Sequence, residues 1–402
     1  MVDVFDKCVL RSDHEMAASL GIYPYYRPVQ ARPAAGEVVI DGRTLVLASS
    51  NDYLGLSGDP RLAEAAARAA GELGCGNGSS RIATGSLALH EELEGRLAEF
   101  VGFEAVMVVS TGYQANLALA PLLGPRETVA ADLDVHASVI DAARLGGTRL
   151  RRFRHNDAAH LARLLEQTRP DAPRVVVTEG MFSVTGDVVD LPGIAEVAQR
   201  YGARLVVDSG HDLGLLGAGG RGVGEHFGMQ PAIDVQTFAL SKTLGSLGGA
   251  VAGPERVIAY LRNRGRAALF SASLPPSCTA AALRALDIVA DEPERRSRVA
   301  AVAERLSTGL AELGFATPVT STPIMAVPIG DTLTCLQMAA GLLDCGVFAL
   351  PMVAPSVPEG QAVIRLGATA AHTDAQVDRI LEAFATTGRR LGLLEALAAA
   401  EG

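Results

Sequence analysis

Residues 204–211, RLVVDSGH, and residues 234–242, DVQTFALSK, decide the fold. Each is a short apolar run that ends in side chains able to do chemistry, Asp208 and His211 in the first and Lys242 in the second. Short apolar runs between helical segments are typical of strands buried in a parallel sheet. In an open α/β sheet, ligands bind beyond the carboxyl ends of the strands. The two stretches therefore predict an α/β protein with a site at that edge.

The sequence around these two stretches alternates between helical segments and apolar runs. We predict early helices at 60–73, 86–100 and 114–123. We predict strands at 105–109, 128–131, 148–153, 174–178, 204–207 and 234–240. Such alternation favours a mostly parallel sheet covered by helices on both faces.

The pattern changes after two long amphipathic helices, which are predicted at 276–292 and 294–313. A smaller α+β region follows them. Its predicted strands are 324–329, 346–350 and 362–366, and its predicted helices are 332–344 and 374–398. A hairpin with an Asp-Gly turn is predicted within 37–47. We therefore predict an N-terminal arm (1–50), a large cofactor-binding domain (51–290) and a small C-terminal domain (291–402).

The composition limits the classes of function. The chain has 402 residues, of which 49% are hydrophobic, and a formal charge of −10. Its arginines are dispersed and form no basic-aromatic stripe, so we expect no nucleic-acid binding. The five cysteines are odd in number and far apart, which predicts neither a disulfide framework nor a metal site and suits a reducing cytoplasm. We find no signal peptide and no membrane-spanning run.

One local cluster is strongly basic, residues 149–154, RLRRFR. Two interpretations stay open. The cluster is a solvated strand edge, the one that we favour, or it is a patch for a polyanionic substrate such as coenzyme A or for an acidic carrier protein.

Four groups of residues follow predicted strands, and each has an ordinary structural explanation when it is taken alone. Thr111 and Gly112 begin a predicted helix, and its first backbone N–H groups could bind an anion. The structural alternative is that Thr111 only caps this helix. His136 stacks on a planar ring, or it is structural. Asp208 pairs with a cation such as a pyridinium nitrogen, or it caps the next turn. Lys242 supplies an amine for a Schiff base, or it lies on the surface.

The four groups taken together are more informative than any one of them. They supply an anion cradle, a stacking ring, a carboxylate and an amine at successive strand ends. These are the groups that pyridoxal 5′-phosphate requires of a protein. The sequence therefore predicts an enzyme with this cofactor, bound through Lys242.

The chain resembles the α-oxoamine synthases, a group of fold-type I pyridoxal-phosphate enzymes, over about residues 20–385. This group includes aminooxononanoate synthase, 2-amino-3-ketobutyrate CoA ligase, 5-aminolevulinate synthase and serine palmitoyltransferase. The matching motifs are Asn51–Leu56 (NDYLGL), Ser80-Arg81, Thr111–Asn116 (TGYQAN), Asp134–Ser138 (DVHAS), Glu179–Ser183 (EGMFS), Asp208–His211, Gly219–Gly222 (GGRG), Ser241-Lys242, Ser271–Pro276 (SASLPP), Arg365 and Ala371–Thr373 (AHT).

The resemblance implies a role for several of these residues. Lys242 would carry the cofactor as a Schiff base, and Asp208 would pair with the ring nitrogen. His211 would contact the ring hydroxyl, His136 would stack on the ring and Ser183 would approach the cofactor. Further cofactor contacts are implied for Thr111, Gly112, Tyr113 and Ser241, and for Ser271 and Ser273 of the neighbouring subunit. The site would therefore be shared within a homodimer.

The resemblance also implies substrate contacts and a reaction. Asn51 and Arg365 would bind the amino-acid carboxylate, which a guanidinium can grip with two hydrogen bonds; Ser80 and Arg27 are further candidates. The implied reaction is a decarboxylative Claisen condensation of an amino acid with an acyl thioester of coenzyme A or an acyl carrier protein. The products would be an α-amino ketone, CO₂ and a free thiol. The alternatives are aminotransferase or decarboxylase chemistry on the same fold, or a non-catalytic partner subunit.

The sequence departs from the family pattern at several positions. Ser209 and Gly210 replace the usual acidic residue and Ala, so that Gly210 is expected to leave room beside the ring. Ala239 replaces a Thr that usually contacts the phosphate. Ser80 stands where aminolevulinate synthases carry a Thr, which argues against glycine as the sole amino acid. Glycine, alanine, serine and a larger substrate such as glutamate all stay open.

Overall fold

The computed structural model describes residues 3–8 and 13–394. Its contacts divide the chain into two compact units. One, here the sheet unit, comprises residues 54–183 and 187–296. The other, here the terminal unit, comprises residues 1–53, 184–186 and 297–402. The terminal unit thus contains residues of both the predicted arm and the predicted C-terminal domain. The predicted division into three domains stays a prediction.

A seven-stranded sheet forms the centre of the sheet unit, in the order β3-β9-β8-β7-β6-β4-β5. β9 pairs antiparallel with both of its neighbours, and the other pairings are parallel. The strands are β3 (Ala105–Val109), β4 (Thr128–Asp132), β5 (Arg151–Phe153), β6 (Arg174–Glu179), β7 (Ala203–Asp208), β8 (Val235–Ala239) and β9 (Gly249–Gly253). The prediction of a mostly parallel sheet is confirmed, whereas β9 was not predicted.

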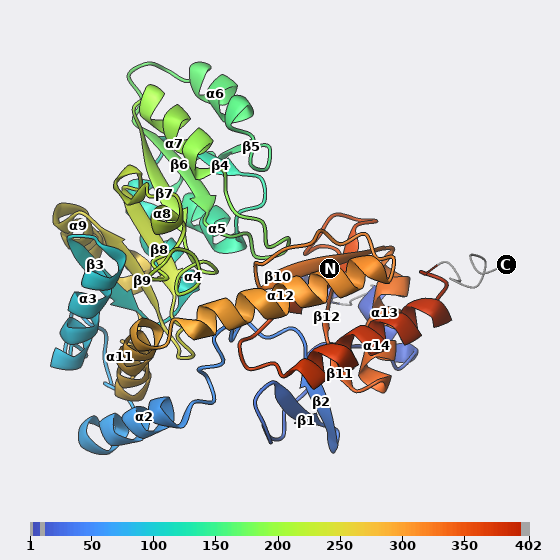
Figure 1. The fold of residues 1–402 in the computed structure, drawn as a ribbon. Helices are drawn as coiled ribbons and strands as arrows, with labels where there is room; N and C mark the ends of the chain where they lie inside the picture. The colour runs from blue at the N-terminus through green and yellow to red at the C-terminus, as the bar shows by residue number, and fades with distance from the viewer. Residues whose placement is uncertain (1–2, 9–12, 395–402) are drawn as a thin grey trace. The chain divides into compact units, whose positions relative to one another are not determined.

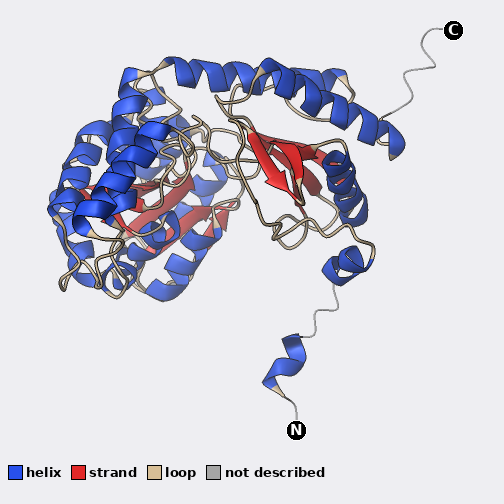
Figure 2. Ribbon diagram, turned by 90° about the horizontal axis from the view of Figure 1, so that it is seen from below, coloured by secondary structure: helices blue, strands red, loops and turns tan. Residues whose placement is uncertain are grey.

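Helices connect these strands and lie around the sheet, as Figures 1 and 2 show. They are α2 (Pro60–Leu73), α3 (Ala88–Val101), α4 (Gly112–Ala118), α5 (Ala137–Gly146), α6 (Ala158–Glu166), α7 (Leu191–Arg200), α8 (Val223–His226), α9 (Glu255–Arg264), α10 (Arg266–Leu269) and α11 (Pro276–Asp291). Capping residues set several helix starts. Asp59, for example, accepts a hydrogen bond from the Arg61 N–H, and Pro60 provides a backbone already suited to the first turn.

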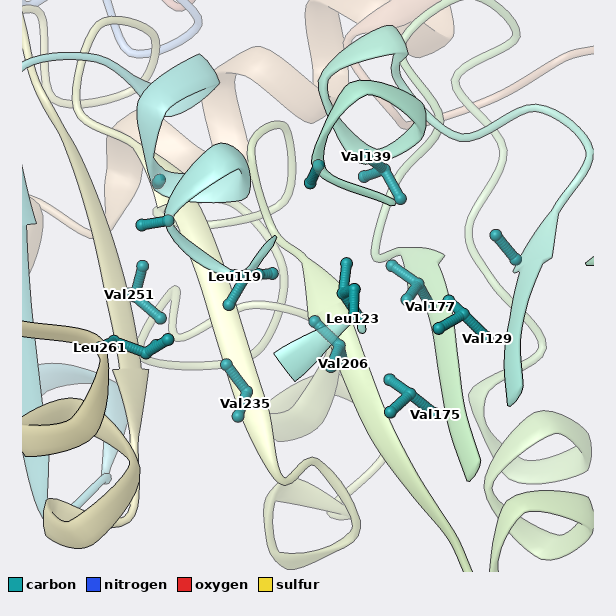
Figure 3. Close-up of a cluster of buried hydrophobic side chains, with 14 of the residues drawn as sticks. Leu119, Leu123, Val129, Val139, Val175, Val177, Val206, Val235, Val251 and Leu261 are labelled. Atoms are coloured by element: carbon teal, nitrogen blue, oxygen red, sulfur yellow. The ribbon is translucent and has the colours of Figure 1, made fainter. Parts of the chain in front are cut away.

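The two faces of the sheet carry separate hydrophobic cores. Val175, Val177 and Val206 pack on one face with residues of α4, α5 and α9, in the cluster drawn in Figure 3. Val176 and Leu205 pack on the other face with residues of α6 and α7. Neighbouring residues of a strand point to opposite faces, so a strand that is covered on both sides is apolar throughout. This is why β6 and β7 appear in the sequence as continuous apolar runs.

Strand direction decides where the loops meet. All strands of the seven-stranded sheet except β9 run the same way, so the segments after β3, β4, β6, β7 and β8 leave the sheet at one edge. Strand β5 is the last strand on its side, and Arg149, Arg151, Arg152 and Arg154 are exposed there. Charged residues on an edge strand discourage pairing with other chains, which agrees with the solvated-edge interpretation.

The terminal unit holds two three-stranded sheets, ordered β1-β2-β11 and β10-β13-β12. Its elements are η1 (Val4–Cys8), α1 (Asp13–Ser19), β1 (Glu37–Ile40), β2 (Arg43–Leu47), β10 (Ile324–Gly330), α13 (Thr332–Asp344), β11 (Val347–Phe348), β12 (Leu350–Met352), β13 (Ala362–Gly367) and α14 (Asp374–Arg390). Helix α12 (Glu294–Glu312) crosses the division, with residues 297–312 in this unit.

The last helix is shorter than the sequence predicts. We expect a helix over 374–398, but α14 ends at Arg390, and residues 391 and 392 form a turn. Gly392 has φ +67° and the N–H of Leu393 bonds to the Gly388 carbonyl, which is how a helix closes on a left-handed glycine. The predicted residues 395–398 lie outside the described residues. Within the described ranges, no helix has both the length and the apolar character needed to cross a bilayer.

Candidate active site

A cavity of about 230 Å³ lies where the strand ends of the sheet unit converge. Residues that follow β3, β4, β6, β7 and β8 all contribute to its wall. The lining residues are Thr111, Gly112, Tyr113, Asn116, His136, Ser138, Glu179, Ser183, Asp208, Gly210, His211, Ala239, Ser241, Lys242 and Leu247. The structure thus brings together every predicted cofactor-binding residue except Ser271 and Ser273.

Asp208 and Lys242 line this cavity from neighbouring strands. Asp208 is the last residue of β7 and is 9% exposed, with Oδ1 accepting the Gly210 N–H at 2.9 Å. Lys242 follows β8, after Ala239, Leu240 and Ser241. A Cβ at Gly210 would lie 3.0 Å from both the Lys242 Nζ and the Asp208 Oδ1. An added Cβ at Gly210 would thus press on the lysine amine, and the expectation that Gly210 leaves room beside a bound ring stays a prediction.

His136 reaches the cavity from the loop after β4. Its Nδ1 lies 2.7 Å from the Ser138 hydroxyl, and its backbone N–H donates to Glu179. Burial lowers the pKa of His136, and the charge of Lys242 acts in the same direction while that of Asp208 opposes it. The imidazole is therefore neutral near pH 7, a state that suits stacking against a flat ring.

Six residues of the cavity wall are missing from the sequence-predicted site, and three of them have polar side chains: Glu179, Asn116 and Ser138. Glu179 is buried at the end of β6, and its two oxygens accept the N–H groups of His136 and Ser183. Burial, and then the charge of Asp208, raise its pKa well above the usual range. Glu179 and Asn116 lie in motifs that the sequence analysis quotes, at the end of β6 and in the helix that follows β3. These positions could have marked them as candidate site residues. The sequence does not show which side chains they contact.

Tyr113 lies at the mouth of the cavity and is 41% exposed. Its ring meets that of His136 edge to face, with centroids 6.0 Å apart and an angle of 78° between the planes. Its hydroxyl donates to Asp141 on α5, and this hydrogen bond raises the pKa of Tyr113. The contact with Asp141 thus restrains the phenol beside the stacking histidine.

The start of α4 forms another part of the wall, at the predicted phosphate end. Thr111 is the N-cap, and its hydroxyl accepts the Gln114 N–H at 3.1 Å. A Cβ at Gly112 would lie 2.7 Å from the Ala239 Cβ, so the backbone approaches β8 closely and only glycine fits. The first N–H groups of a helix have no partner inside it, which leaves them available to an anion.

Ser271 and Ser273 line a different cavity of about 200 Å³, beside Arg81 and Arg262. Ser271 accepts from the Gln114 amide at 2.8 Å, and Ser273 accepts from the Asn77 amide at 2.8 Å. Their predicted contact with the cofactor of a neighbouring subunit stays a prediction. Ser80 lies in a turn, where its carbonyl accepts the N–H groups of residues 83 and 85, and it lines neither cavity.

The other predicted substrate residues, Asn51, Arg365 and Arg27, belong to the terminal unit. The Tyr53 hydroxyl donates to the Asn51 Oδ1 at 3.1 Å and accepts from the Arg365 guanidinium at 3.4 Å. Arg365 is 4% exposed, so its orientation is fixed. Arg27 pairs with Asp41 at 3.1 Å. The roles of these three residues in substrate binding stay predictions.

An ionic cluster lies outside the cavity lining, around His155. Its Nδ1 lies 3.0 Å from the Asp132 carboxylate, and its Nε2 lies 2.7 Å from that of Asp187. The ring packs edge to face on Phe182, with centroids 4.3 Å apart. Hydrogen bonds to the two carboxylates raise the pKa of His155 to about 10, so it is a cation at neutral pH. The cluster ties the loop before His136 to the segment around Phe182.

Comparison with known proteins gives one consistent result. Residues 43–384 match the model of the aminotransferase class I and II family. An 8-amino-7-oxononanoate synthase of Symbiobacterium thermophilum is 42% identical over 92% of this chain and 95% of its own. A serine palmitoyltransferase of Sphingobacterium spiritivorum is 38% identical over 92% of each chain. The chain belongs to the α-oxoamine synthase family. A solved structure of the serine palmitoyltransferase of S. paucimobilis superposes on this α-oxoamine synthase with a TM-score of 0.95 and 32% sequence identity. The alignment covers 98% of this chain and 100% of the other.

Family membership sets the fold type and the cofactor. The chain has the fold-type I architecture and is a pyridoxal-phosphate-dependent enzyme of the acyltransferase type. Its residues fit this cofactor, because a lysine amine and a buried carboxylate line one cavity with a neutral imidazole and a helix start. Among the described residues, no group of three or more His, Cys, Asp and Glu side chains is arranged to hold a metal ion.

Proposed function

We propose that this enzyme condenses an amino acid with an acyl thioester of coenzyme A or an acyl carrier protein, releasing CO₂ and the free thiol. The observation that carries the proposal is the shared cavity of Lys242, Asp208 and His136. The new carbon–carbon bond joins the amino-acid Cα to the thioester carbonyl carbon, and the thiol is the leaving group. The α-amino ketone is the product that remains after the carboxylate is lost as CO₂.

The residues of the cavity have distinct tasks in this proposal. The bound cofactor supplies an electron sink for negative charge at the substrate Cα. Lys242 holds the cofactor and then serves as the base that removes the Cα proton. Asp208 holds the proton of the ring nitrogen, and His211 contacts the ring hydroxyl. His136 packs on the face of the ring, with Ser183 close to the cofactor.

The substrate carboxylate is assigned to Asn51 and Arg365, with Ser80 and Arg27 as further candidates. The Tyr53 hydroxyl bonded to both Asn51 and Arg365 supports this assignment, since it orients an amide and a guanidinium together. The chemistry supports it as well, because a guanidinium can grip a carboxylate with two parallel hydrogen bonds.

Coenzyme A release tests the reaction. The purified protein, loaded with pyridoxal phosphate, is mixed with each common amino acid and a panel of acyl-CoA thioesters, and free thiol is measured. We expect thiol release only with both substrates present, and none from Lys242→Ala. Formation of a keto acid without thiol release would indicate an aminotransferase instead. A protein that shows no visible absorbance band with the cofactor would be a non-catalytic subunit.

We also propose a homodimer in which Ser271 and Ser273 complete the site of the neighbouring subunit, and a cytoplasmic location. All five cysteines are free thiols, which agrees with a reducing compartment. Mixing two inactive variants tests the shared site. Lys242→Ala and the double variant Ser271→Ala/Ser273→Ala are each expected to have little activity, and mixed dimers regain it because one complete site forms. Absence of recovery in mixed dimers contradicts a shared site.

A further inference from the structure

Asn116 is the buried centre of a hydrogen-bond network in the wall of the cavity. Its Nδ2 donates to the Asp208 Oδ2 at 2.6 Å and to the Ser138 Oγ at 2.8 Å. Its Oδ1 accepts from the Thr237 hydroxyl at 2.7 Å. A carboxylate only accepts hydrogen bonds, so the NH₂ group must face Asp208, and the orientation of the amide is fixed. Asn116 is 3% exposed and joins β7, α5 and β8 through its three partners.

One branch of the network ends at His136. The Ser138 hydroxyl accepts from Asn116 and lies 2.7 Å from the His136 Nδ1, which also accepts the Ser138 backbone N–H at 3.4 Å. Because Nδ1 accepts, the neutral imidazole carries its hydrogen on Nε2. Burial of the ring, which lowers the pKa of His136, agrees with that neutral form.

The other branch ends at Asp208. Its Oδ2 accepts the Asn116 amide, and its Oδ1 accepts the Gly210 N–H at 2.9 Å. Each oxygen of the carboxylate thus accepts one hydrogen bond, and the two contacts fix its orientation. The nearby Glu179 has its pKa raised well above the usual range by burial and then by the charge of Asp208.

We propose that Asn116 is a positioning residue that holds the Asp208 carboxylate and the His136 imidazole together for the cofactor ring. Asn116 acts through these two side chains, one proposed for the ring nitrogen and the other for the ring face. The inference rests on the proposed roles of Asp208 and His136.

Two variants test it through cofactor affinity, measured by adding pyridoxal phosphate to the apoprotein. Asn116→Ala removes a hydrogen bond to a charged group, and we expect the cofactor to bind about tenfold more weakly. Asn116→Asp sets two carboxyl groups against each other. Protonated Asp can still donate to Asp208, so binding by Asn116→Asp approaches that of the wild type at low pH and weakens progressively as the pH rises.

The controls separate positioning from stability. Thr168→Val removes a buried hydroxyl that bonds Leu165 and Arg174, at the opposite end of the sheet, and is expected to lower the melting temperature with unchanged cofactor affinity. Ser138→Ala breaks only the His136 branch and is expected to weaken binding less than Asn116→Ala.

The outcomes are distinct. If Asn116→Ala loses stability as Thr168→Val does but binds the cofactor as tightly as the wild type, Asn116 is merely structural and the inference is wrong. Should Asn116→Ala fail to fold, the pH dependence of Asn116→Asp decides: a profile parallel to that of the wild type overturns the inference. Failure of the wild type itself to bind pyridoxal phosphate overturns the proposed function instead.

Discussion

Two histidines at the same edge of the sheet are held in opposite charge states. Burial lowers the pKa of His136, whose side-chain contact is the neutral Ser138 hydroxyl. The carboxylates of Asp132 and Asp187 raise the pKa of His155 to about 10. Desolvation disfavours a charge, and a nearby opposite charge favours it. The cavity wall thus holds a neutral ring suited to a flat ligand, while the cluster outside it is an ion-paired structural anchor.

The largest expected effect comes from removing the neutral histidine of the cavity wall, His136. His136→Ala removes the stacking ring, and we expect kcat/KM to fall about 100-fold, which corresponds to roughly 2.7 kcal/mol. Thermal unfolding of this variant is expected to stay close to that of the wild type. Steady-state thiol release and a melting curve on one preparation check both statements. Near-normal kcat/KM would remove His136 from the catalytic site.

The second effect comes from breaking the outer cluster. His155→Ala leaves the buried Asp132 and the partly exposed Asp187 without their shared cation. We expect a loss of about 2–3 kcal/mol in the free energy of unfolding, because hydrogen bonds to charged groups are lost. Denaturant titration measures the loss. His155→Gln is the milder control, since its amide can still bond one carboxylate. A stability equal to that of the wild type would show that the ion pairs contribute nothing.

The pH dependence of the unfolding free energy tests whether His155 is charged. The pKa of His155 is raised by folding, from 6.5 to about 10. Its contribution is therefore complete below about pH 6.5 and is lost as the pH rises through about 10. We expect the gap in unfolding free energy between the wild type and His155→Gln to be larger at pH 7 than at pH 10. A gap that widened with pH would contradict the assigned charge.

Burial also shifts the pKa of a carboxyl group, Asp212. Its substitution is expected to have the smallest effect of the changes considered. Asp212 is fully buried, burial raises its pKa to about 7, and its Oδ1 has no hydrogen-bond partner in the described part of the chain. A raised carboxyl pKa supports folding at low pH, and this support is lost as the pH rises from 3.8 to about 7. Asp212→Asn is therefore expected to be more stable than the wild type by about 1 kcal/mol at pH 8. The advantage should shrink at pH 4, as paired denaturation curves can check.

Much of the fold follows from local patterns. Continuous apolar runs such as 174–178 predict strands because both of their faces are covered, and α11 follows the predicted range almost throughout. Strand β9, Gly249–Gly253, escapes such patterns because glycines normally indicate a turn. The close approach of the start of α4 explains the glycine, since a Cβ at Gly249 would lie 2.3 Å from the carbonyl oxygen of Thr111, the N-cap of that helix.

Site residues could be predicted where their position in the sequence, at the end of a strand, fixes their location in the fold. Asp208 ends β7 and Lys242 follows the end of the neighbouring strand β8, so strand direction brings them together. Asn116 was not predicted as a functional residue, because its role depends on partners 22 and 92 positions away in the chain. Side-chain contacts of this kind are set by packing between elements, and no local pattern carries them.

Trapping the lysine–cofactor bond tests the central claim most directly. The sequence holds only two lysines, Lys7 and Lys242, so borohydride reduction in the presence of pyridoxal phosphate followed by peptide mass mapping has few possible outcomes. We predict a pyridoxyl adduct on the peptide that contains Lys242. An adduct confined to Lys7 or the N-terminal amine, or the absence of any adduct, would contradict the account.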